Sequence, residues 1–150
     1  MTAQTETQPY SATEFGALYA EIQQFYARHM HLLDDGDADA WAAGFTEDAS
    51  FSVPTLPAPV VGRAGLAAAV RRTAEALADA GEQHRHWPGV FDVRPQEDGS
   101  VVVHSYTTVF ASPLGGASRV HRVCTCTDVL VREGGRLLVK AREVARDDLR

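Results

Sequence analysis

Apolar residues near the N-terminus of the chain recur at helical spacing. Across residues 15–33 they return every three or four positions, which predicts an amphipathic helix. Ser11 and Glu14 precede this run in a capping-box arrangement, in which a hydroxyl and a carboxylate satisfy free N–H groups of the first turn. The acidic segment 34–37 is expected to end the helix, because Gly36 can adopt the left-handed conformation that closes a helix.

Two further helices and a short strand are predicted before residue 82, where the pattern changes to one typical of strands. Asp37 can cap a short helix that carries Trp41. Apolar and polar residues alternate over 49–53, which predicts a short strand, and a proline-containing loop follows it. The segment 62–81 predicts a third helix, which Gly81 ends.

The rest of the chain reads as extended strands joined by tight turns. Residues 90–95 run into the turn QEDG, and the strand 100–112 returns from it. Two more strands, 119–132 and 136–146, flank a short hairpin loop at 133–135. Helices followed by an antiparallel meander predict an α+β domain in which helices cover one face of a curved sheet.

Length and charge narrow the classes of protein to which the chain can belong. A chain of 150 residues without repeats suits one domain, so we expect a single domain at 11–150 behind a disordered polar tail at 1–10. The net charge of −6 argues against nucleic acid and against an anionic membrane surface as partners. The opening segment MTAQTETQPY has neither the basic start nor the apolar run of a secretory signal.

Two cysteines are present, Cys124 and Cys126, two positions apart on one face of a predicted strand. This spacing does not suit an ordinary disulfide, and two thiols without a second ligand pair do not make a zinc site. We expect small buried thiols in a reducing compartment, which together with the missing signal predicts a cytoplasmic protein.

Four segments carry a resemblance to a known fold family. They are FYARHMHLLDDGDADAWAAGFTEDASFSVP at 25–54, GRAGLAAAVR at 62–71, HRHWPGVFDV at 84–93 and TDVLVREGGRLLVKAREVARDD at 127–148. Their order and spacing resemble the nuclear transport factor 2-like superfamily, and more closely its SnoaL-like polyketide cyclase group. The resemblance implies a cone-shaped α+β fold, with a curved antiparallel sheet and three N-terminal helices on its concave face.

The resemblance also implies a range of functions. The chain is similar to accessory proteins of aromatic polyketide gene clusters, which implies that a polycyclic aromatic intermediate binds in an enclosed pocket. Family members include cyclases, dehydratases, isomerases and epoxide hydrolases that work without a cofactor, and others without known catalysis. Fold does not decide among these. The alternatives are therefore a cofactor-free cyclase, dehydratase or isomerase, or a non-catalytic ligand-binding or regulatory partner of tailoring enzymes. Many members form homodimers through the outer face of the sheet.

The stretch HRHWPG at 84–89 holds the leading candidate for chemistry. His84 and His86 share one face of the predicted strand. A metal site would need further ligands, such as the distant His104 or His121, and we expect no metal. His86 suits general acid–base chemistry, because histidine titrates near neutral pH. The alternative is a histidine that lines the pocket or bonds to the backbone at the strand start. His121 is expected at an exposed surface or a subunit interface.

Two carboxylates on the last strands are further candidates. Asp128 lies on a strand face with small apolar groups, where the pKa of a carboxyl tends to rise toward that of a base. Glu143 is expected to face inward from the last strand. For each residue the alternative is an ion pair with an arginine, such as Arg122 for Glu143. In an enzyme, Asp128 or Tyr26 would assist His86.

The remaining candidates are residues that could contact a ligand. Trp41, Phe51 and His29 lie where the open end of a cone is expected, and aromatic rings there could stack on a planar polyketide or simply fill the core. His104 and Tyr106 alternate with small and β-branched residues along one strand. The sequence does not decide which of these two sets faces the pocket.

Overall fold

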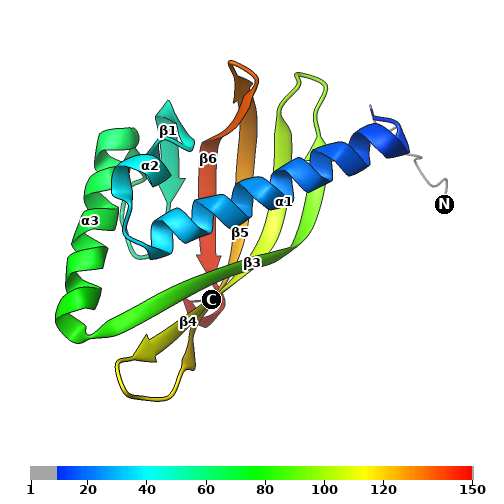
Figure 1. The fold of residues 1–150 in the computed structure, drawn as a ribbon. Coiled ribbons are helices and arrows are strands. Elements are labelled where there is room, and N and C mark those ends of the chain that lie inside the picture. The colour runs from blue at the N-terminus through cyan, green and yellow to red at the C-terminus, as the bar shows by residue number, and fades with distance from the viewer. Residues whose placement is uncertain (1–9, 150) are drawn as a thin grey trace.

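The computed structural model describes residues 10–149, in which helices pack on one side of a six-stranded sheet (Figure 1). This arrangement confirms the α+β class and the three helices on the concave face. In chain order, the elements are α1 (Ala12–Asp34), α2 (Ala38–Ala42), β1 (Phe45–Ser52), β2 (Val60–Val61), α3 (Arg63–Ala80), β3 (Glu82–Pro95), β4 (Val101–Pro113), β5 (Arg119–Glu133), β6 (Arg136–Arg146) and the 3-10 helix η1 (Asp147–Leu149).

The helices begin and end where local chemistry predicts. The Ser11 hydroxyl accepts a hydrogen bond from the Glu14 amide at 3.2 Å, and the Glu14 carboxylate accepts one from the Ser11 amide at 2.8 Å. Gly36 follows α1 with φ of 72°, and Gly81 ends α3 with φ of 63°. The side chain of Asp37 caps α2.

The sheet has the strand order β2-β1-β6-β5-β4-β3. Strands β3 to β6 form the expected antiparallel meander. Strand β1 pairs in parallel with β6, so the sheet is mixed rather than wholly antiparallel. This pairing arises because the meander starts at the far edge and its last strand returns beside β1 in the same direction. The two-residue strand β2 lies in the segment expected to be a loop only.

A β-bulge at Lys140 determines which residues of β6 face inward. The pairing with β5 skips Lys140, so the alternation of faces changes at that point. Leu137 and Val139 are buried before the bulge, and Arg142 is buried after it. The expectation that Glu143 faces inward is therefore wrong, because its side chain is exposed on the outer face.

The core lies between α1 and the concave face of the sheet. Ile22 of α1 and Phe45, Val103, Leu130 and Val139 of the sheet have no exposed surface. Each such side chain contributes about 1.5–3 kcal/mol through its removal from water. This packing holds α1 diagonally across the strands (Figure 1).

The tail expected at 1–10 lies outside the described residues, except for Tyr10, which packs half-buried against the core. Within residues 10–149, no helix is long and apolar enough to cross a membrane.

Candidate functional site

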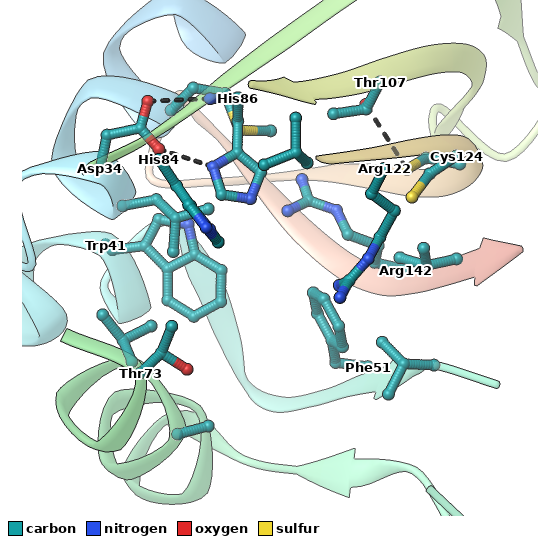
Figure 2. Close-up of a pocket in the computed structure, with 18 of the residues that line it drawn as sticks. Asp34, Trp41, Phe51, Thr73, His84, His86, Thr107, Arg122, Cys124 and Arg142 are labelled. Carbon is teal, nitrogen blue, oxygen red and sulfur yellow. Dashed lines mark hydrogen bonds and ion pairs between the residues drawn. The ribbon is translucent and has the colours of Figure 1, made fainter. Parts of the chain in front are cut away.

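A cavity of about 470 Å³ lies between α1, α3 and the concave face of the sheet (Figure 2). Cavities of this size hold drug-sized ligands. Apolar side chains form most of its wall, and a smaller set of polar and charged groups interrupts them. The polar and charged members are Tyr26, Asp34, Thr73, His84, His86, Ser105, Thr107, His121, Arg122, Cys124, Cys126, Asp128 and Arg142.

His86 and Asp34 form a dyad on the cavity wall. The Asp34 carboxylate lies 2.6 Å from His86 Nδ1 and accepts a second bond from the His86 amide at 3.0 Å. Asp34 is the last residue of α1, and its side chain is 6% exposed against 26% for His86. A carboxylate at Nδ1 favours the tautomer that protonates this nitrogen and leaves Nε2 as a proton acceptor. Figure 2 shows the His86 ring held by Asp34 and directed into the cavity. The dyad has the geometry of a general base with an orienting partner.

Asp128 lies in a buried hydrogen-bond network rather than among apolar groups alone. Its carboxylate accepts bonds from Tyr26 Oη at 2.7 Å and from Arg142 Nε and Nη2 at 2.9 and 2.8 Å. Asp128 is 1% exposed and Arg142 is 5% exposed. Of the two alternatives that the sequence left open for Asp128, the structure has the ion pair with an arginine.

His29 extends this network into the aromatic core. Its Nε2 accepts a hydrogen bond from Arg142 Nη1 at 3.1 Å, and its ring stacks on Trp41 at 5.3 Å between centroids. Burial, and then the charge of Arg142, hold the pKa of His29 well below its usual range. Burial, and then Asp128, raise the pKa of Tyr26 well above its usual range. His29 is therefore a neutral acceptor and Tyr26 a permanent donor. His29 packs behind Trp41 and does not line the cavity.

The other predicted ligand contacts divide between the two faces of the sheet. Trp41 and Phe51 both line the cavity (Figure 2). His104 and Tyr106 lie on the outer face, because the alternate positions of β4 are the buried ones. Glu143 is on the outer face as well. These three side chains therefore do not line the cavity.

Sequence reasoning missed several polar residues of the cavity wall, among them Asp34, His121 and Arg122. Asp34 was read only as part of a helix-ending turn, and it is 52 positions from His86, so no local pattern links them. His121 and Arg122 both line the cavity, because a register shift in β5 at His121 breaks the alternation of faces. His121 is exposed, which is one of the two alternatives expected for it, and its side chain also borders the cavity.

The two cysteines are unpaired, as expected. Burial raises the pKa of Cys126 to about 11, and burial also raises the pKa of Cys124. Neither thiol is an activated nucleophile. Among residues 10–149, no three His, Cys, Asp or Glu side chains gather in a way that could hold a metal ion.

Comparisons with known proteins identify a matching family and several similar structures. The sequence model of the SnoaL-like domain matches residues 17–143. Aln2 from a Streptomyces species is 36% identical and superimposes with a TM-score of 0.82 over 89% of this chain and 93% of its own. ActVI-ORFA from Streptomyces coelicolor is 32% identical, with a TM-score of 0.83 over 90% and 98%. A Catenulispora acidiphila protein in complex with S-DNPA is 37% identical, with a TM-score of 0.76 over 89% and 96%. No match was found among curated proteins.

Proposed function

The chain belongs to the SnoaL-like family, and from this premise we propose that it binds a polycyclic aromatic polyketide intermediate and transforms it without a cofactor. The family and the similar structures support a polyketide-related role. The observation that carries the chemical part is the dyad of His86 and Asp34 on the wall of an apolar cavity.

In the proposed reaction, His86 acts as the acid and base. Its Nε2 takes a proton from the carbon next to a ligand carbonyl, and the electron pair of that C–H bond moves toward the carbonyl. The imidazolium then returns the proton to a leaving hydroxyl, which departs as water, or to a second carbon in an isomerisation. Asp34 positions the ring and stabilises the imidazolium. General acid–base catalysis of this kind contributes about 10²–10⁴-fold.

The remaining residues of the cavity wall would bind the ligand and maintain the shape of the cavity. Trp41 and Phe51 offer aromatic surface on which a planar ligand could stack. Asp128 and Tyr26, the candidates for assisting His86, would act by holding Arg142 in place, because their hydrogen bonds are already made to one another. We therefore propose that Asp128 and Tyr26 keep the part of the cavity wall around Arg142 rigid.

A second candidate function is a non-catalytic ligand-binding partner of tailoring enzymes. The buried hydrogen-bond network around Arg142 favours this candidate. His29, Tyr26 and Asp128 are all bonded within that network, so a reaction would have only the dyad of His86 and Asp34 for acid–base chemistry. A protein of this kind would bind the aromatic ligand in the same cavity and release it unchanged.

The proposed quaternary structure is a homodimer formed through the outer face of the sheet. The helices lie on the opposite side (Figure 1). Trp87, Tyr106, Val120 and Val123 on this outer face are 70%, 58%, 58% and 40% exposed. Apolar groups that gather on an open sheet face typically mark an interface.

A binding and conversion assay separates the two candidate functions. Polycyclic aromatic polyketides are titrated against the protein, and each ligand that binds is incubated and checked by mass spectrometry for loss of water or for a new isomer. We expect conversion by the wild type, and by a His31→Gln control on the exposed face of α1, but not by His86→Gln. Binding without conversion would support the accessory role, and no binding would contradict both candidates.

A further inference from the structure

The cavity contains a basic side chain whose charge the neighbouring groups do not neutralise. Arg122 of β5 is half-buried and reaches into the cavity (Figure 2). Its Nε is buried without a hydrogen-bond partner, and no carboxylate of residues 10–149 forms an ion pair with it. Nη2 lies 3.5 Å from His121 Nε2, at the limit of a hydrogen bond. The outer guanidinium nitrogens are not buried in this way, so they can reach an acceptor that enters the cavity.

The acidic groups of this region are engaged with other bases. The two carboxylates in the described cavity wall are Asp34 and Asp128, and both are paired as described above. Glu82, beside the cavity, bonds to His84 at 3.0 Å and to Arg119 at 3.1 Å. The pKa of Asp148 is lowered chiefly by its hydrogen bonds to Arg146, with a smaller contribution from Arg122. These pairs leave the Arg122 charge for a group that enters the cavity.

The position of Arg122 suits a substituent of a ligand that reacts at His86. In the sheet, His86 pairs with Val109 and Val109 pairs with Arg122, so the three residues form one row across the strands. Two strand spacings separate His86 from Arg122, which is about 10 Å. A fused aromatic ligand can span this distance, with one end at Arg122 and a reacting carbon near His86 Nε2.

We propose that the ligand carries a carboxylate and that Arg122 binds it. The guanidinium presents parallel N–H donors that match the two oxygens of a carboxylate, which a neutral substituent cannot reproduce. The inference rests on the proposed function, because it assigns the substrate class of that same cavity. The ligand is thus an aromatic acid.

A pair of probes that differ in charge tests the inference. Anthraquinone-2-carboxylate and anthraquinone-2-carboxamide have the same ring system, and their affinities are measured by isothermal titration calorimetry. We expect the wild type to prefer the carboxylate by about tenfold to a hundredfold, the range for a charge-assisted hydrogen bond. Arg122→Met should abolish this preference while binding the amide as well as the wild type does. Arg85→Met removes the same charge from the outer face of β3 and should keep the preference.

Each possible result bears on one of the two proposals. Equal affinity of the wild type for both probes would overturn the carboxylate site and leave aromatic binding intact. A preference that survives in Arg122→Met would also overturn it. If neither probe binds, the proposed aromatic ligand fails together with this inference. Arg122→Lys keeps the charge and loses the parallel donors. It serves as the control in case Arg122→Met misfolds, and it should show a preference for the carboxylate between those of the wild type and Arg122→Met.

Discussion

Replacing Arg142 by methionine should destabilise the protein strongly, because it would leave Asp128 buried without a countercharge. Asp128 is 1% exposed and accepts three hydrogen bonds from the guanidinium, the longest of them 3.1 Å. Removing one partner of a buried ion pair costs about 3–5 kcal/mol. Since small domains are stable by about 5–15 kcal/mol, Arg142→Met would be marginally folded.

Removing both charges together should cost much less than the two single changes combined. In Asp128→Leu/Arg142→Met no buried charge remains, and the main loss is the acceptor of the Tyr26 hydroxyl. A buried donor without an acceptor costs about 1–3 kcal/mol. The double variant should therefore be more stable than Arg142→Met alone, which means a coupling energy of several kcal/mol between the two sites.

Urea denaturation followed by circular dichroism gives the free energies of unfolding for this cycle. Linear extrapolation applies if the slope with urea stays constant across the variants. Tyr26→Phe, which removes one hydrogen bond to the carboxylate, serves as a mild reference at about 1.5–3 kcal/mol. A cost below about 1 kcal/mol for Arg142→Met, or a double variant that equals the sum of the singles, would refute the assignment of a buried, mutually dependent pair.

Three further predictions follow from buried and exposed side chains. Burial, and then Arg142, lower the pKa of His29 in the folded state, so below its ordinary value of 6.5 only the unfolded chain takes up this proton. The free energy of unfolding should then fall by about 1 kcal/mol between pH 6.5 and 5.5, and the urea midpoint of His29→Gln should depend less on pH over this range. Cys126, with a pKa of about 11, should react with a disulfide reagent at pH 8 far more slowly in the folded protein than in urea, and equal rates would contradict its burial. Trp87→Arg should convert a dimer to a monomer in analytical ultracentrifugation, whereas a monomeric wild type would contradict the proposed interface.

Local chemistry predicted the ends of the elements, because each end depends on residues close in sequence. Ser11 and Glu14 cap α1 through bonds that span three positions. Gly134 and Gly135 both have positive φ, as the two-residue hairpin loop between β5 and β6 requires. The family resemblance supplied the arrangement of these elements, which is confirmed by the superimposed structures.

The site was predicted less completely, because its contacts join distant positions and depend on strand register. His86 was identified from its own chemistry, but its partner Asp34 comes from the end of α1 and has no local signal. The bulge at Lys140 exchanges Glu143 for Arg142 on the inner face of β6. The irregularity at His121 similarly brings His121 itself into the cavity wall, next to Arg122. A strict alternation along each strand cannot anticipate such shifts.

The catalytic rate of His86→Gln on the first ligand that the wild type converts tests the central claim most directly. We expect kcat to fall by about 10²–10⁴-fold while the dissociation constant of the ligand stays unchanged, because the glutamine keeps a polar side chain of similar volume and cannot transfer the proton. A variant that converts the ligand at the wild-type rate would contradict the assignment of the dyad of His86 and Asp34 as the acid–base group of the cavity.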